Sequence, residues 1–313
     1  MIYTIALIIA SLIPPFALLW YFERQDRGHK EPRKLKLNIF LWGVLAALMA
    51  SFIENGVEAF YPSIGISMQN NFWIYIFFTS FLTAALVEES MKLWVVKTHA
   101  YNRPPFNEVM DGITYTIIAS LGFASIENIF YVLEGGVSVA IIRALLAVPA
   151  HAFFSGVMGY FIGVAKVAKT EKLANRLLYR GLVIAIIYHG LYNFILFSES
   201  WLLVFIIPLM VIMGMHLRSK IKQAYFDDKI TKKIVPKFTS KVVLKLLFGT
   251  LFIFLSVSTI ILAIYAPFEK QLGLSVSAVF APTSLACFAL GYIILRKRKK
   301  PKLPPQSSAQ KTT

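Results

Sequence analysis

The chain is short of cysteine and of charge. Its 313 residues include a single cysteine, Cys287, which excludes an intramolecular disulfide and a metal site built from cysteines. Charged residues make up 15% of the sequence and hydrophobic residues 57%, with a mean hydropathy of +0.66. A soluble globular protein of this length carries more charge than that. The composition therefore predicts a polytopic membrane protein.

Long polar segments are also scarce, because most of the chain consists of apolar runs near the roughly 20 residues that a transmembrane helix requires. Nine such runs cover residues 2–22, 37–55, 72–96, 112–133, 137–165, 181–197, 201–217, 244–266 and 272–295. The predicted fold is all-α, a bundle of about nine transmembrane helices. We interpret residues 1–217 as the core, 218–245 as a basic cytoplasmic loop, 246–295 as two additional spans and 296–313 as a basic disordered tail.

Acidic residues are half as frequent as basic ones, 16 against 32. Nearly all basic residues fall in alternate loops, at residues 23–36, 97–111, 166–180, 218–245 and 296–313. The positive-inside rule then places the N-terminus outside and the C-terminus in the cytoplasm of a multi-pass protein of the cell membrane. A net charge of +16 that follows the topology indicates contact with anionic lipids. It argues against nucleic acid as a partner.

Because charges inside the apolar runs are few, those that are present are informative. Glu88 and Glu89 are neighbours in the third run, where even one carboxylate near mid-bilayer costs at least about 2.5 kcal/mol. Lys92 lies one helical turn further on and can reach either carboxylate. We expect it to neutralise one of them and leave the other available. The spacing does not say which.

Further polar groups lie in the three runs that follow. Glu127 is in the fourth run, His151 in the fifth, and His189 and Asn193 are one helical turn apart in the sixth. At about 1.5 Å per residue, these residues and Glu88 lie about 12 to 23 Å from the cytoplasmic ends of their helices. We therefore predict that all of them line one water-filled cavity.

Carboxylates, imidazoles and an amide in one pocket suit the activation of water and the stabilisation of an oxyanion. They also suit zinc, for which two histidines, a glutamate and a water form a common ligand set. Two other functions use the same groups. A proton- or ion-coupled transporter would use them as a relay, and a non-catalytic scaffold or immunity protein would share the fold without the chemistry.

Four motifs follow one another on successive runs: Glu88-Glu89-Ser-Met-Lys92, Phe123-Ala-Ser-Ile-Glu127-Asn128, His151-Ala152 and His189-Gly-Leu-Tyr-Asn193. In order and spacing they resemble the motifs of the PrsW family of intramembrane proteases, over roughly residues 1–217. That family belongs to a wider group with the CAAX prenyl proteases and bacteriocin-immunity-type membrane proteins. The resemblance implies cleavage of a single-span membrane protein, typified by the first cut in a membrane-bound anti-sigma factor during envelope-stress signalling.

The resemblance also implies roles for individual residues. Glu88 or Glu89 would be the base that activates water, and Glu127 would help to hold that water. His189 and Asn193 match the last motif of the prenyl proteases and would stabilise the oxyanion of the tetrahedral intermediate.

Two departures from the prenyl proteases keep a second mechanism open. Lys92 stands four residues after the first glutamate, where those enzymes carry an arginine four after the second, and His151 has no counterpart there. In the metal mechanism, Glu127, His151 and His189 hold Zn²⁺ and Glu88 is the base. We favour the mechanism without a metal or other cofactor.

Overall fold

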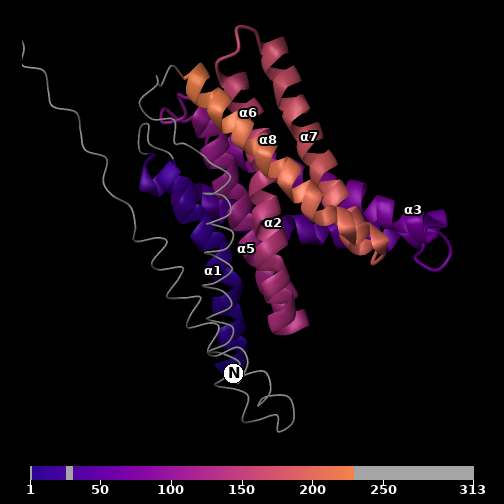
Figure 1. Ribbon diagram of the computed structural model, residues 1–313. Helices are drawn as coiled ribbons and strands as arrows, with labels where there is room; N and C mark the ends of the chain where they lie inside the picture. The colour runs from indigo at the N-terminus through magenta and orange to yellow at the C-terminus, as the bar shows by residue number, and fades with distance from the viewer. Residues whose placement is uncertain (1, 26–30, 229–313) are drawn as a thin grey trace, which may run out of the picture. The chain divides into compact units, whose positions relative to one another are not determined.

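The computed structural model describes residues 2–25 and 31–228, and every regular element in these ranges is helical (Figure 1). The predicted spans at 244–266 and 272–295 and the tail at 296–313 lie outside the described residues. The helices are α1 (Ile2–Gln25), α2 (Arg33–Phe60), α3 (Phe72–Phe77), α4 (Leu86–His99), α5 (Val109–Ile142), α6 (Val148–Lys166), α7 (Glu171–Phe197) and α8 (Ile206–Asp227).

Short segments of tighter or wider helix join some of these elements. The 3₁₀ helices are η1 (Tyr61–Ile64) and η4 (Trp201–Phe205), and the π-helices are η2 (Phe78–Ala85) and η3 (Arg143–Ala147). α3, η2 and α4 form one continuous stretch, as do α5, η3 and α6. π-helical turns are rare and are frequent at functional sites. Both of them contribute to the cavity described below.

Six helical stretches among the described residues are long and apolar enough to cross a membrane. The longest, Val109–Lys166, has 58 residues, which at about 1.5 Å per residue is far more than one crossing needs. It is broken at Gly136, whose φ of 67° and ψ of −155° are accessible to glycine and not to other residues. This break separates the predicted runs 112–133 and 137–165.

Beyond Gly136 the chain folds back, and α6 packs against the beginning of α5. A Cβ atom added to Gly159 would lie 2.5 Å from the carbonyl oxygen of Gly112, and one added to Gly163 would collide with the backbone of Val109. Small residues at such positions let two helix backbones approach closely within a membrane. α6 also packs against α7 and α8, which places it in the interior of the bundle.

The last described helix, α8, continues past the predicted end of its span at residue 217 and reaches Asp227. The carboxylate of the next residue, Asp228, accepts hydrogen bonds from the backbone N–H groups of Val109 (2.6 Å) and Met110 (3.0 Å). The first N–H groups of a helix have no acceptor within it, so Asp228 supplies one to α5. A contact between segments far apart in sequence therefore accompanies the longer helix.

Large apolar side chains cover much of the outer surface. Phe52, Trp201, Ile207 and Met215 are all more than half exposed, an exposure that a bilayer makes favourable. The described chain is a multi-pass membrane protein of helices, and the full count of nine spans and the orientation stay predictions.

Candidate active site

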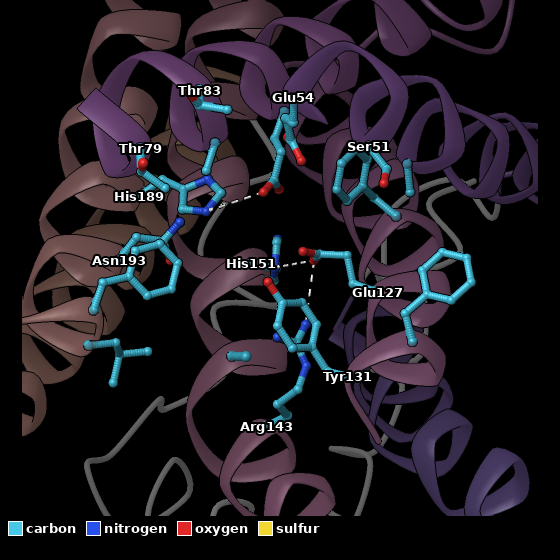
Figure 2. Close-up of a pocket in the computed structure, with 18 of the residues that line it drawn as sticks. Ser51, Glu54, Thr79, Thr83, Glu127, Tyr131, Arg143, His151, His189 and Asn193 are labelled. Atoms are coloured by element: carbon cyan, nitrogen blue, oxygen red, sulfur yellow. Dashed lines mark ion pairs between the residues drawn. The ribbon is translucent and has the colours of Figure 1, made fainter. Parts of the chain in front are cut away.

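The candidate site is a cavity of about 690 Å³ between the helices (Figure 2). Its walls come from α2, η2, α4, α5, η3, α6 and α7. Five of the six predicted site residues line it, namely Glu88, Glu127, His151, His189 and Asn193. The sixth, Glu89, is fully buried beside the cavity. The structure thus brings together residues that are as much as about a hundred positions apart in the sequence.

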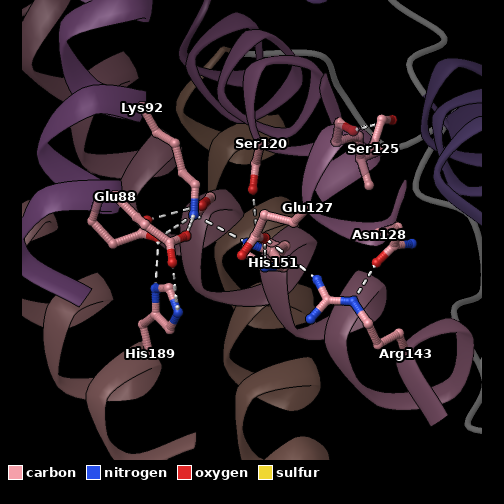
Figure 3. A network of polar contacts seen from close by, with 12 residues as sticks. Glu88, Lys92, Ser120, Ser125, Glu127, Asn128, Arg143, His151 and His189 are labelled. Carbon is pink, nitrogen blue, oxygen red and sulfur yellow. Dashed lines mark hydrogen bonds and ion pairs between the residues drawn. The ribbon is translucent and has the colours of Figure 1, made fainter. Parts of the chain in front are cut away.

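The ammonium group of Lys92 is the centre of the polar network (Figure 3). It donates hydrogen bonds to Glu88 Oε2 (3.0 Å), Glu89 Oε1 (2.7 Å) and His151 Nδ1 (3.0 Å). An ammonium has three N–H donors, so all of them are used. The Nζ atom also lies 4.4 Å from the ring centroid of Phe123, within the range of a cation–π contact. Lys92 therefore contacts both carboxylates, whereas the sequence led us to expect that it neutralises one.

Both carboxylate oxygens of Glu89 contact polar groups of neighbouring side chains. Its Oε1 atom accepts from Lys92 and lies 3.1 Å from His189 Nδ1, and its Oε2 atom accepts from the hydroxyl of Ser155 at 2.9 Å. The residue has no solvent-exposed surface. Its hydrogen bonds are characteristic of a group that holds other side chains in place.

Only one carboxylate oxygen of Glu88 accepts a hydrogen bond from a described residue. Its Oε2 atom accepts from Lys92, while its Oε1 atom lies 3.7 Å from His189 Nε2, which is longer than a hydrogen bond. Oε1 makes no hydrogen bond with any described residue, and Glu88 lines the cavity. The structure therefore distinguishes two glutamates that the sequence spacing left equivalent.

His151 joins Lys92 to the opposite wall of the cavity. Because its Nδ1 atom accepts from the Lys92 ammonium, the proton of a neutral His151 is on Nε2, which lies 2.8 Å from Glu127 Oε2. Arg143 of η3 lies on the other side of Glu127, with Nη2 at 3.5 Å from Oε2, and its Nε atom donates to Asn128 at 2.7 Å (Figure 3). Glu127 is thus held by one imidazole and one guanidinium.

Asn193 lies one turn after His189 on α7 and is 9% exposed. It lines the cavity (Figure 2), and its carboxamide makes no hydrogen bond with any residue in the described part of the chain. The ring of Phe154 stacks on His189 with the centroids 4.5 Å apart, which fixes the imidazole beside it. Asn193 therefore offers amide donors to a ligand.

Sequence reasoning missed two residues that belong to this site. Glu54 of α2 lines the cavity, and its Oε1 atom is buried without a hydrogen-bond partner among the described residues. A carboxylate in the second apolar run was the signal, and the lining residues Ser51 and Glu58 repeat at helical spacing on its face. Ser155, the partner of Glu89, carried no signal, because a serine among small residues is ordinary in a membrane helix.

Buried carboxylates and imidazoles around a cavity between transmembrane helices suit an enzyme that activates water within the membrane. The sequence model described as "PrsW family intramembrane metalloprotease" matches residues 31–216, and the chain belongs to this family. The matched segment contains all six predicted site residues as well as Lys92 and Glu54. Membership in a protease family favours the protease over the transporter and scaffold alternatives.

Curated relatives agree with this assignment. The chain is 39% identical to Protease PrsW of Geobacillus kaustophilus over 197 residues, which cover 63% of this chain and 82% of the relative. It is 35% identical to Protease PrsW of Bacillus subtilis over 219 residues, which cover 70% and 95% of the two chains. Protease PrsW of Oceanobacillus iheyensis is 34% identical over 220 residues, 70% of this chain and 96% of that one. No solved structure matches the chain.

The family description implies a metal, so the donor atoms are the test of whether one fits. Among the described residues, donor atoms of Glu88, Glu89 and His151 lie within 4.8 Å of one another, a set that differs from the predicted Glu127, His151 and His189. By chemistry these three suit a divalent ion. However, the Lys92 ammonium contacts each of them. In this arrangement the three side chains bind an ammonium group at the place where they would otherwise bind a metal ion.

Proposed function

We propose that this protease hydrolyses a peptide bond of a membrane-anchored substrate with a water molecule that Glu88 activates. The observation that carries this role is the free Oε1 atom of Glu88, which faces the cavity while both oxygens of Glu89 are engaged. A general base must be within hydrogen-bond reach of the proton that it takes. Of the two adjacent carboxylates, Glu88 meets that condition for a water in the cavity.

Attack on a peptide carbonyl produces an oxyanion, which hydrogen-bond donors must stabilise. The carboxamide of Asn193 is buried, faces the cavity and has its donors available. His189 lies one turn before it and is oriented by Glu89 through Nδ1. We assign the oxyanion to the carboxamide of Asn193 together with His189 in its doubly protonated form, since Nδ1 already donates to Glu89 and the second donor must come from Nε2. We assign the positioning of the water to Glu127 with His151.

The substrate that we propose is a single-span membrane protein such as an anti-sigma factor. The cavity reaches residues near the ends of α2, α5 and α7, among them Glu58, Glu134 and Phe197. In the orientation predicted from the basic loops, this end faces the outside, and the basic loops contact anionic lipids. Reporters fused at residues 65 and 169 should report outside and cytoplasm respectively. The reverse result would overturn this orientation.

The decisive experiment is cleavage of a co-expressed single-span anti-sigma factor. We expect Glu88→Gln to reduce cleavage by at least about 10²-fold, because an amide cannot take a proton from water, while the protein accumulates normally in the membrane. Glu58→Gln is the matched control, since Glu58 lines the same cavity away from the network. Undiminished cleavage by the Glu88→Gln variant would rule out the proposed base.

A further inference from the structure

We propose that Lys92 is the resident cation of this active site and occupies the position that a metal ion would take. The inference deepens the proposed function, on which it rests for the role of Glu88. It departs from the metalloprotease description of the family. Two features of the site support this role: the side chains that surround the lysine, and the lone pairs that these side chains have left.

The three side chains that accept hydrogen bonds from Lys92 are the same three that form the candidate metal-binding group. Glu88, Glu89 and His151 contribute the one such group found among the described residues, and each accepts a hydrogen bond of 2.7 to 3.0 Å from Lys92 Nζ. A metal ion bound by these atoms would have to occupy the same space as the Lys92 ammonium. Two cations at that separation repel each other strongly in a low dielectric, so the site holds one or the other.

The two imidazoles differ in where their lone pairs lie. The lone pair of His151 is on Nδ1 and accepts from Lys92, and its other nitrogen lies 2.8 Å from Glu127 Oε2. His189 donates from Nδ1 to Glu89 Oε1 at 3.1 Å, so the lone pair of a neutral His189 is on Nε2. That atom lies 3.7 Å from Glu88 Oε1, but His189 belongs to no group of three close metal-ligand atoms among the described residues. A zinc ligand needs a free imidazole lone pair, and that of His151 becomes available when Lys92 is removed.

The lysine is also held in place from its apolar side. Its side chain has no exposed surface, and Nζ lies 4.4 Å from the ring centroid of Phe123 and 5.3 Å from that of Phe154. An aromatic face attracts a cation, so these rings favour the ammonium at this place. Lys92 acts as a positioning residue, because it holds one oxygen of Glu88 and leaves the other directed to the cavity.

The test uses the full chain purified in detergent, with zinc as the probe. We expect wild-type protein to carry no zinc above background after dialysis against buffered zinc, and to cleave its substrate equally well with a chelator present. Lys92→Met removes the ammonium with little change in length. We expect that variant to bind about one zinc per chain and to unfold at a higher temperature with zinc than without it.

Lys92→Arg is the matched control, because it keeps the positive charge and is expected to bind no zinc. Wild-type protein that carries one zinc per chain, and that loses cleavage on chelation and regains it with zinc, would overturn the inference. A folded Lys92→Met variant without zinc affinity would overturn it too. If Lys92→Met does not accumulate, the zinc content of the wild type decides.

The two proposals fail in different ways. Zinc uptake by Lys92→Met is measured without a substrate, so it supports the lysine as resident cation even if Glu88→Gln still cleaves. Conversely, zinc-dependent cleavage by the wild type would overturn the lysine inference while leaving Glu88 as the base.

Discussion

The polar network has a closed side around Glu89, which is buried, and an open side around Glu88, which lines the cavity. Glu89 bonds to Lys92, His189 and Ser155, whereas Glu88 bonds to Lys92 and presents its second oxygen to the cavity. Consecutive residues of an α-helix point about 100° apart, so each faces different neighbours. Two residues of one type thus acquire different tasks from the helices that pack against them.

The largest expected effect comes from breaking the closed side. Glu89→Ala leaves three buried donors without an acceptor, and we expect it to lower the free energy of unfolding by about 3 to 5 kcal/mol. Glu88→Ala removes one hydrogen bond where cavity water can replace it, so its cost should be about 1 kcal/mol. Denaturant titration of both variants in detergent micelles measures the difference.

Glu89→Gln is the control for that comparison. Its amide oxygen still accepts from Lys92 and His189, and its NH₂ group can donate to the hydroxyl of Ser155. We therefore expect it to retain most of the stability that Glu89→Ala loses. Equal losses for Glu88→Ala and Glu89→Ala would contradict the distinction between the two sides.

A second substitution probes the open side. Asn193→Ala should lower kcat by about 10² to 10³-fold, as the loss of one oxyanion donor does in other hydrolases. Its free energy of unfolding should change by less than about 1 kcal/mol, because the carboxamide has no partner in the described part of the chain. Asn55→Ala, on the exposed part of the cavity lining, should leave kcat unchanged. A stability loss without a kcat loss would assign Asn193 to packing.

The smallest expected effect sharpens a contrast within the bundle, between its tightly packed helices and its open cavity. Gly159→Ala would place a Cβ atom 2.5 Å from the carbonyl oxygen of Gly112, and overpacking of this kind costs about 1 to 3 kcal/mol. Gly56→Ala on α2 meets nothing within 4 Å and should be neutral or slightly stabilising. Thermal unfolding in detergent compares the two. Similar midpoints would mean that the α5–α6 contact is not tight.

Much of the site was predictable because carboxylates, imidazoles and amides are scarce in the apolar runs. Glu88, Glu127, His151, His189 and Asn193 stand out for that reason, and their similar depth predicted one cavity, which the structure contains. Depth along a helix follows from residue number. Which way a side chain turns does not, because it depends on the neighbouring helices.

The rest could not be predicted because it depends on contacts between distant segments. The bond from Lys92 to His151 spans 59 positions and that from Ser155 to Glu89 spans 66. Neither bond has a local signature in the sequence, although the bond from Ser155 is one of those that leave Glu89 without a free oxygen. Glu54 was overlooked for a different reason, since its significance depends on the carboxylates that share its cavity.

The cap that Asp228 provides to α5 bears on where the folding unit ends. The family match stops at residue 216, yet the carboxylate that receives the first N–H groups of α5 comes twelve residues later. A fragment cut at the family boundary would leave those groups without their acceptor at the start of the helix that carries Glu127. A fragment that keeps this cap must therefore extend at least through residue 228, beyond the limit that sequence similarity alone would set.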